Sequence, residues 1–522
     1  MRKRLLLLTI LCFGVYGLYA QQNNPGNYYH NPVIPGDLPD PTIIRVGNTY
    51  YAAGTTSDFA PHYPLYESAD LINWKQIGAI FHKTPEWTSD SFWAPELYYH
   101  NGTFYAFYAA KRKGDRISCI GVATTKNIYE GFTDQGILIE WGDEAIDAFV
   151  FRDDDEKFYI FWKAYGLTPG RPIEILGSEL DLEGLSLIGE HFSVTDYDAG
   201  WRGHGDEGQS IFKRNGMYYM LYSNGGCCDN RCDYRVLVSR SKDLRSGWEQ
   251  LPDPILEGGG QWLCTGHGTL VTTPDNRYFY TYHSYHATDF EYIGRQGMLD
   301  EMVWNETTGW PRFKNDTYAS EKAEIPFQNT KQNREAVYSE DFSTDKHLKN
   351  WQWDLNKTRP EMKRTSDGLE LSSKNEGLVF TGISPKTGNF VFDAGVQPET
   401  GTQSGICIYG NAKNLLALTV KGNRLVLFSI KNGTEEKLAD QRISLNGSMK
   451  LRLEAENGRY FRFFYSYDNM DWIELKLDGP AQFDGHFLPQ WGAAYRTGLI
   501  FNSNDSGSAK FSYVRMENKF RN

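Results

Sequence analysis

A short aromatic motif recurs five times between Gly47 and His283, and its spacing limits the possible folds more than any other feature of the chain. Each copy is a polar turn followed by two aromatic residues and an apolar run, as in NGTFYAFYAA and NGMYYMLYS. The first aromatic residues of successive copies are 54, 54, 60 and 60 positions apart: Tyr50, Phe104, Phe158, Tyr218 and Tyr278. Such a period indicates a repeat architecture in which each copy is one supersecondary unit.

Each copy also has a short apolar segment before its turn: PTIIR, ELYYH, AFVFR, QSIFK and TLVTT. Two apolar segments joined by an Asn-Gly or Asp-rich turn predict a β-hairpin. Five small antiparallel units favour a five-bladed β-propeller over residues 27–317, because a β-sandwich does not require a regular period of this length. The first strand of each blade is then the strand nearest the central channel.

The composition agrees with an all-β chain and narrows the class of ligand. Aromatic residues make up 15% of the chain, which also has 51 glycines and no long Ala/Leu/Glu/Lys run. The formal net charge of −12 argues against nucleic acid or an anionic membrane surface as the main partner. We therefore expect a neutral, ring-shaped ligand such as a sugar.

Equivalent positions at the start of the five first strands carry ionisable or aromatic side chains. Counting back ten or eleven residues from each aromatic pair reaches Asp40, Trp93, Asp147, Glu207 and His267. Positions with a purely structural role would carry small or apolar residues. Because these five residues instead stand at the same point of each repeat, we expect their side chains to converge at the mouth of the channel. Three neighbouring carboxyl groups cannot all ionise without mutual cost, so one pKa should rise. An acid, a base and aromatic residues are what glycoside hydrolysis requires.

The same cluster leaves a metal site open as an alternative. Carboxylate oxygens would suit Ca²⁺, and His267 could orient a carboxylate, bind sugar or hold a channel ion. We expect that hydrolysis requires no cofactor. The one ion predicted for this cluster is a structural Ca²⁺ in the channel.

Residues 31–313 resemble glycoside hydrolase family 43. The segments NPVIPGDLPDPTIIR, AIDAFVFRDDDEKFYIFW and DEGQSIFKRNGMYYMLYS are similar, in this order, to three motifs of that family. The resemblance implies that Asp40 is the general base and Glu207 the general acid. It also implies that Asp147 orients the acid and tunes its pKa. Family members are five-bladed propellers, in agreement with the repeat.

The resemblance further implies three substrate contacts. Trp93 in FWAPEL, His267 in GHGTLV and Arg295 in YIGRQGM stand at the corresponding places. Two positions depart from the common motifs, because Ala148 and Gln209 stand where the family usually has proline. Neither change removes a chemical group, but both bear on the assignment to a subfamily.

The mechanism that the resemblance implies is inversion, in which Glu207 protonates the leaving oxygen while Asp40 deprotonates a water. This geometry needs carboxyl groups about 6.5–9.5 Å apart. The leading prediction is an exo-acting enzyme that releases pentose as a β-D-xylosidase, an α-L-arabinofuranosidase or both. The alternatives are an endo-acting arabinanase or xylanase, a noncatalytic glycan-binding propeller, and a retaining propeller that hydrolyses fructans.

The repeat stops before a second predicted domain. Residues 318–337 are polar and predict a linker, whereas residues 338–522 alternate in short strands joined by KGN, KNG and ENG turns. This pattern predicts an antiparallel β-sandwich. The segment EDFSTDKHLKNWQW resembles the start of the concanavalin-like sandwiches of family 43 β-xylosidases and arabinofuranosidases. We expect the sandwich to stabilise the propeller and to close its pocket. Trp351, Trp353 and Trp491 could stack on sugars, but packing in the core is the more frequent role of tryptophan in a sandwich.

Residues 1–20 have the layout of a secretory signal peptide, with three cations, an apolar run and a terminal Ala20. The apolar run is too short to span a membrane, so we expect a secreted or periplasmic protein. That compartment permits disulfides. The segment GGCCDNRC predicts one among Cys227, Cys228 and Cys232, since no second Cys pair or His pair supports zinc.

Overall fold

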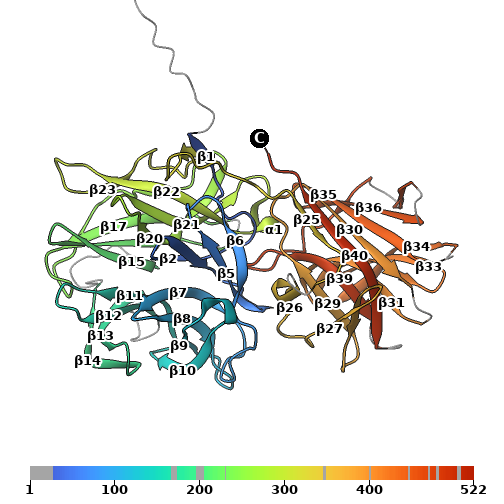
Figure 1. Ribbon diagram of the computed structural model, residues 1–522, viewed down its shortest axis with the longest axis horizontal. Coiled ribbons are helices and arrows are strands. Elements are labelled where there is room, and N and C mark those ends of the chain that lie inside the picture. The colour runs from blue at the N-terminus through green and yellow to red at the C-terminus, as the bar shows by residue number, and fades with distance from the viewer. Residues whose placement is uncertain are drawn as a thin grey trace, which may run out of the picture.

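The chain forms two lobes of β-strands, one N-terminal and one C-terminal (Figure 1). This computed structural model describes residues 27–165, 173–194, 205–229, 231–344, 348–398, 401–444, 447–467, 471–477, 481–502 and 507–521. The signal peptide predicted over residues 1–20 lies outside the described residues. Within those ranges, no helix is both long and apolar enough to cross a membrane.

Each of the five predicted hairpins forms two neighbouring antiparallel strands of the N-terminal lobe. The polar segments form the turns, and the apolar segments on either side of each turn pair as strands. The hairpins are β2 (Thr42–Val46) with β3 (Thr49–Ala53), β7 (Trp93–His100) with β8 (Thr103–Lys111), β11 (Glu144–Arg152) with β12 (Phe158–Tyr165), β15 (Glu207–Arg214) with β16 (Met217–Asn224), and β20 (Trp262–Thr272) with β21 (Tyr278–His286).

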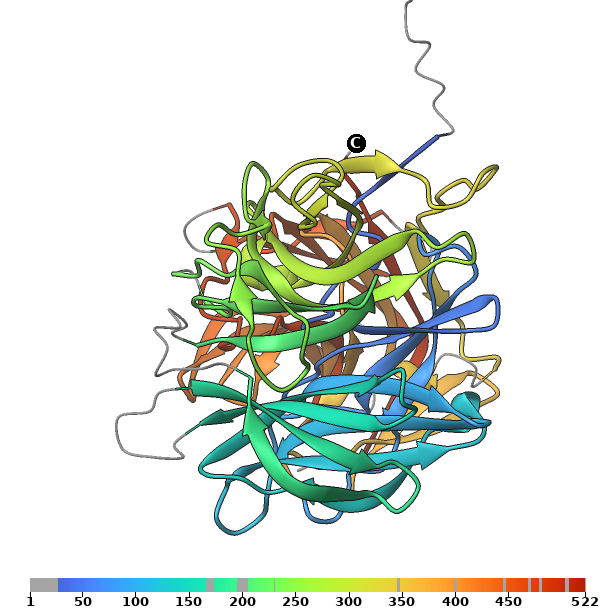
Figure 2. The same cartoon turned by 90° about the vertical axis from the view of Figure 1, so that its left-hand side faces the viewer.

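Further antiparallel strands extend each hairpin into a small sheet. They are β5 (His62–Ser68) and β6 (Lys75–Phe81), β9 (Ser118–Thr125) and β10 (Thr133–Ile139), β13 (Ile173–Asp181) and β14 (Ser186–Ser193), β17 (Arg235–Ser241) with β18 (Glu249–Gln250) and β19 (Leu256–Glu257), and β22 (Gln296–Trp304) with β23 (Pro311–Phe313). One parallel pairing of β9 with β11 joins two of these sheets into one. Figure 2 shows this lobe facing the viewer. The all-β prediction is confirmed, and the number of blades stays a prediction.

The C-terminal lobe contains two large antiparallel sheets, as the sandwich prediction requires. Apolar residues such as Phe392, Leu418 and Leu453 pack between the sheets and are fully buried. One sheet has the order β29 (Leu378–Ile383), β39 (Arg496–Asn502), β31 (Gln403–Asn411), β32 (Asn414–Lys421), β33 (Arg424–Lys431), β34 (Thr434–Arg442). The other has β27 (Glu361–Thr365), β28 (Gly368–Ser372), β40 (Ser508–Asn518), β30 (Phe390–Gln397), β35 (Met449–Glu456), β36 (Tyr460–Tyr467) and β37 (Ile473–Glu474).

Of the three tryptophans expected in the core of the C-terminal lobe, two are buried and one is exposed. Trp351 and Trp353 are buried, which is the packing role predicted for most tryptophans of a sandwich. Trp491 differs, because 65% of it is exposed.

The two lobes are joined by strand pairing and by a buried ion pair. Within the predicted linker, β24 (Lys322–Glu324) pairs with β1 (Tyr28–His30), so this segment packs on the N-terminal lobe. The short strand β26 (Trp353–Asp354) pairs with β4 (Phe59–Ala60) across the interface. Asp37 and Arg496 form an ion pair at 3.2 Å with side chains only 2% exposed. These contacts place the C-terminal lobe beside the segment that leads into Asp40.

Candidate active site

The same backbone irregularity occurs at the start of all five inner strands. Asp40, Ala94, Asp147, Gly208 and His267 have φ values of 51°, 38°, 57°, 61° and 41°. In four of the five hairpins the pairing register also shifts at this point. Such bulges redirect side chains, and a non-glycine residue with positive φ costs on the order of 1–3 kcal/mol. The fold thus maintains a strained turn where the sequence places its ionisable residues.

One of these positions requires glycine. A Cβ on Gly208 would lie 2.7 Å from Cγ of His267, and the φ of 61° already favours glycine. Glu207 and Trp93 each precede the irregular position of their strand by one residue, so the repeat alignment is one residue out of phase in these two units. Gly208 lets the strand carrying Glu207 approach His267 closely.

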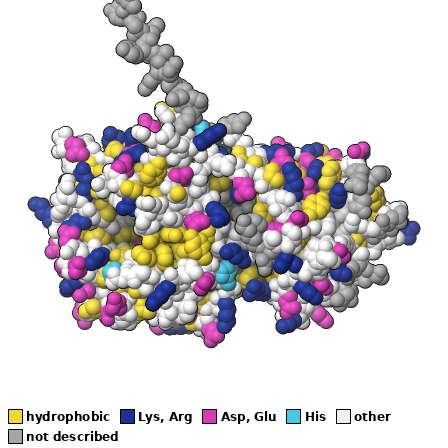
Figure 3. Space-filling model, viewed as in Figure 1, with side chains coloured by type: hydrophobic (Ala, Val, Ile, Leu, Met, Phe, Trp, Pro, Cys, Tyr) yellow, Lys and Arg dark blue, Asp and Glu magenta, His cyan; other side chains and the backbone are white. Residues whose placement is uncertain are grey.

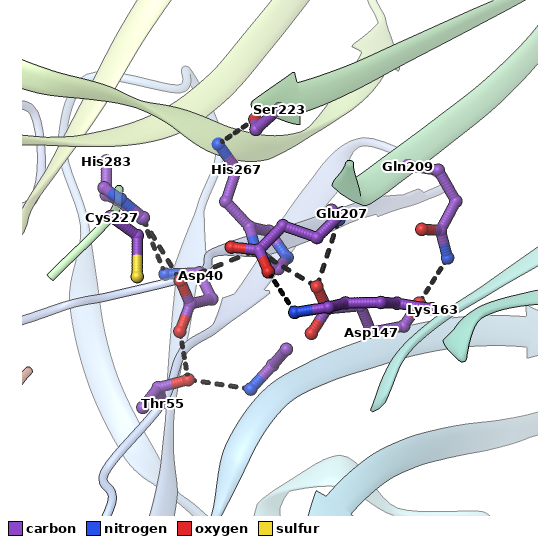
Figure 4. A network of polar contacts seen from close by, with 12 residues as sticks. Asp40, Thr55, Asp147, Lys163, Glu207, Gln209, Ser223, Cys227, His267 and His283 are labelled. Carbon is purple, nitrogen blue, oxygen red and sulfur yellow. Dashed lines mark hydrogen bonds and ion pairs between the residues drawn. The ribbon is translucent and has the colours of Figure 1, made fainter. Parts of the chain in front are cut away.

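Asp40 is buried and held by groups from other elements (Figure 4). Its Oδ1 accepts a hydrogen bond from Arg295 at 2.8 Å, and its Oδ2 accepts one from Thr55 Oγ1 at 2.7 Å. Its backbone N–H donates to Nδ1 of His283 at 3.0 Å. Although burial raises the pKa of Asp40, the charges of Arg295 and His267 hold it well below its usual range. Asp40 is therefore a carboxylate over the working pH range of most enzymes.

Glu207 lies between a cation and a phenol. Its Oε2 accepts a hydrogen bond from Lys163 Nζ at 2.6 Å, and its Oε1 accepts one from Tyr234 at 2.7 Å. Burial raises the pKa of Glu207, but the Lys163 ammonium outweighs burial and holds this pKa below its ordinary value. The family resemblance implies that Asp147 tunes the pKa of Glu207, but at this site the Lys163 ammonium is the charge that decides the direction of the shift.

The raised pKa belongs to Asp147. Its Oδ2 accepts a hydrogen bond from the Gly208 N–H at 3.1 Å. Burial and the nearby Glu207 charge raise the pKa of Asp147 to about 7, against the opposing charges of His267 and Lys163. Because the Glu207 charge is one cause of this raised pKa, the protonation of Asp147 and the protonation of Glu207 are linked.

His267 lies between the two sides of the cluster. Its Nδ1 is 3.5 Å from Asp40 Oδ1 and 3.8 Å from Asp147 Oδ2, and its backbone N–H donates to Ser223 at 2.7 Å. Over the described ranges, no group of three or more His, Cys, Asp or Glu side chains has an arrangement suited to a metal ion. The channel Ca²⁺ at His267 accordingly stays a prediction.

The other two predicted substrate contacts occupy different settings. Trp93 begins β7 and is half-buried, with the Lys111 ammonium 5.4 Å from its ring centroid. Arg295 is buried and bridges the lobes, because it donates to Asp40 and, at 3.1 Å, to the backbone oxygen of Gly492. The C-terminal lobe therefore reaches the Asp40 side of the cluster through Gly492, next to the exposed Trp491.

Sequence reasoning missed four residues that hold the carboxyl groups: Lys163, Tyr234, Thr55 and His283. Lys163 had a usable signal, since it is a single cation within the apolar strand FYIFWKAY. A buried cation in such a strand needs an anionic partner. The other three are ordinary polar residues near strand ends, and nothing in their spacing marks them.

The cysteines pair partly as predicted. Cys227 and Cys228 form a disulfide within the predicted cluster, which confirms that part of the prediction. Cys232 instead pairs with Cys264, three residues before His267. The fold brings together Cys232, in the loop after β16, and Cys264, in β20, so local spacing could not predict the second disulfide.

Comparison with known proteins decides the family. Residues 29–311, more than half of the chain, match the family model described as glycosyl hydrolases family 43. The chain belongs to glycosyl hydrolase family 43. Residues 389–517 of this family 43 glycosidase also match the β-xylosidase C-terminal concanavalin A-like domain. Both predicted resemblances are confirmed.

Similar family 43 proteins include named pentosidases. A xylan 1,3-β-xylosidase of Vibrio sp is 26% identical over 500 residues, covering 86% of this chain and 90% of that protein. An extracellular exo-α-(1→5)-L-arabinofuranosidase of Cellvibrio japonicus is 28% identical over 331 residues, covering 55% and 90%. The crystal structure of a xylan β-1,4-xylosidase from Bacillus halodurans has a TM-score of 0.78 at 21% identity, covering 94% of this chain and 99% of that one. The last likeness shows the fold.

Proposed function

We propose that this family 43 glycosidase is a secreted, inverting, exo-acting enzyme that releases single pentose units as a β-D-xylosidase, an α-L-arabinofuranosidase or both. One observation carries the proposal: Asp40 lies among cations that keep it ionised, whereas burial and the Glu207 charge raise the pKa of Asp147 to about 7. His267 Nδ1 lies 3.5 Å from a carboxyl oxygen on one side and 3.8 Å from one on the other. Opposite environments for neighbouring carboxyl groups separate a base from an acid.

In the proposed mechanism Asp40 deprotonates a water that attacks the anomeric carbon. Arg295 and Thr55 hold the Asp40 carboxylate in place through both of its oxygens. On the opposite face, Glu207 donates a proton to the leaving oxygen, and Asp147, with its pKa raised to about 7, keeps a proton available to Glu207. Lys163 and Tyr234 orient Glu207, and Lys163 offsets the negative charge that Glu207 regains. An inverting enzyme uses this division of roles when room for water separates the two carboxyl groups.

The contact between Gly492 and Arg295 supports exo action. A backbone segment of the C-terminal lobe lies against Arg295, the residue that holds the proposed base Asp40, and this contact favours a site that is closed on that side. A closed pocket admits the end of a chain, whereas an endo-acting arabinanase or xylanase needs a groove that is open at both ends.

Secretion and a neutral saccharide partner rest on separate observations. The segment 1–20 has the layout of a signal peptide, and the Cellvibrio relative is described as extracellular. Two disulfides suit an oxidising compartment. On the face shown in Figure 3, cationic and anionic side chains are interspersed over both lobes, as suits a neutral polymer.

A substrate panel tests the proposal. Aryl β-D-xylopyranoside and aryl α-L-arabinofuranoside are compared with the corresponding β-glucoside and β-galactoside, followed by xylo- and arabino-oligosaccharides labelled at the reducing end. We expect cleavage of one or both pentosides and release of monosaccharide from the unlabelled end. Internal cleavage of the labelled oligosaccharides would contradict exo action, and a preference for hexosides would contradict the pentose assignment.

A further inference from the structure

The disulfide between Cys227 and Cys228 lies in the loop that follows β16, next to the carboxyl cluster. Figure 4 draws Cys227 with Asp40 and His283, and Cys227 packs on the cluster that contains Tyr234, whose ring stacks on that of His283. Cys228 is buried, whereas Cys227 is half-buried, so one side of the disulfide remains accessible. Nothing in the mechanism above uses this pair.

The disulfide packs against residues that support both the acid and the base. Cys227 contacts the small apolar cluster built on Tyr234 and Tyr285, and Tyr234 is the phenol that holds Glu207. The backbone oxygen of Cys228 accepts a hydrogen bond from Tyr285 at 3.4 Å. The loop is therefore continuous with the wall of the site.

The same disulfide faces the other lobe. A Cβ on Gly492 would lie 3.6 Å from Cβ of Cys228 and 3.9 Å from Nη2 of Arg295. Cys228 thus lies beside the point where the backbone of the C-terminal lobe meets the arginine that holds Asp40. A sugar whose anomeric carbon is near Asp40 would have the disulfide on one side.

We infer that the Cys227–Cys228 disulfide is a wall of the sugar pocket, on which the C–H face of the bound ring packs. The inference rests on the proposed function. Charged and hydrogen-bonding groups surround the described carboxyl cluster, and the half-buried Trp93 is its one predicted aromatic contact, so the disulfide would supply a second apolar surface for the sugar ring. Ligand pockets normally combine a few polar groups with apolar surface, and a disulfide supplies such a surface without a donor.

A purely structural role gives a different expectation. If the disulfide only stiffened the loop that carries Tyr234, its loss would disturb Glu207 and lower kcat. If it is a binding wall, its loss weakens sugar binding and raises KM while kcat changes little. The second disulfide, Cys232–Cys264, ties the same loop to β20 and packs in the same cluster as Tyr234, so it offers a matched control for a purely structural role.

The test compares two double variants, C227S/C228S and C232S/C264S, with the wild type on whichever aryl glycoside the wild type cleaves. We expect KM to rise about tenfold in C227S/C228S, the effect of one lost apolar contact, with kcat within about twofold. C232S/C264S should keep the wild-type KM. An unchanged KM, or a fall in kcat alone, in C227S/C228S would overturn the inference.

Reduction of the folded wild type provides a second measurement if a variant fails to fold. A phosphine reductant and one water molecule convert the disulfide to two thiols, and the phosphine takes the water oxygen to become phosphine oxide. Mass spectrometry identifies the cysteines released, and we expect the KM to rise when Cys227 and Cys228 are reduced. An unchanged KM after their reduction would again overturn the inference. Wild-type cleavage of hexosides alone would overturn the pentose assignment instead, so the two failures are distinguishable.

Discussion

Replacing Glu207 with glutamine should lower kcat/KM on a pentose disaccharide by about 10²–10⁴-fold, because the amide cannot donate a proton to the leaving oxygen. An aryl glycoside with an acidic phenol needs less protonation and should lose less activity. The difference between the two substrates therefore identifies the step that Glu207 serves.

The control for this variant is Glu144→Gln. Glu144 also approaches Lys163, at 4.0 Å, but it is a more exposed carboxylate than Glu207. Its replacement should leave kcat/KM within about threefold of wild type, as for a surface substitution. Full activity of Glu207→Gln on the disaccharide, or an equal loss on both substrates, would remove Glu207 from the acid role.

The pH profile of the wild type gives a second reading of the same acid. Burial and Glu207 raise the pKa of Asp147 to about 7, so Asp147, whose protonation is linked to that of Glu207, loses its proton as pH rises through that value. We therefore expect kcat/KM of the wild type to fall as pH rises through about 7. In Glu207→Gln this dependence of kcat/KM on pH should become flatter.

Replacing Asp40 with asparagine should lower kcat/KM by about 10²–10⁴-fold on activated and unactivated substrates alike, since both need an activated water. The introduced amide would retain the size of the side chain but not the charge that Arg295 binds. Thermal unfolding of the variant shows whether the fold persists. Asp153→Asn, in the turn after β11, is the matched control, and its activity should stay near wild type.

The outcome for Asp40→Asn separates the base from a general electrostatic role. Loss of activity on the disaccharide with retained activity on the aryl glycoside would mean that water attack does not depend on Asp40. Together, Asp40→Asn and Glu207→Gln test opposite faces of the sugar.

The sequence predicted the hairpins and the convergence of Asp40, Asp147 and Glu207 because both follow from a period. Aromatic pairs mark the second strand of each hairpin, and a fixed count back from each pair reaches the inner strand. The sequence could not show which residue of each repeat has positive φ. In the units of Trp93 and Glu207 it is the following residue, Ala94 or Gly208.

Contacts between different units could not be predicted in the same way. Lys163 comes from one hairpin and Glu207 from the next, and their ion pair moves the raised pKa from Glu207 to Asp147. Cys232 and Cys264 are likewise brought together only by the fold. A period places equivalent residues around an axis, but the charge balance at the centre depends on residues outside the repeated position.

The anomeric configuration of the first sugar released tests the account most directly. Proton NMR of the wild-type reaction, read before the product mutarotates, separates the two possible anomers. Asp40 as base and Glu207 as acid predict a pentose of inverted configuration: α-xylose from a β-xyloside, or β-arabinofuranose from an α-arabinofuranoside. A product of retained configuration would require a carboxylate to attack the sugar directly and would contradict the account.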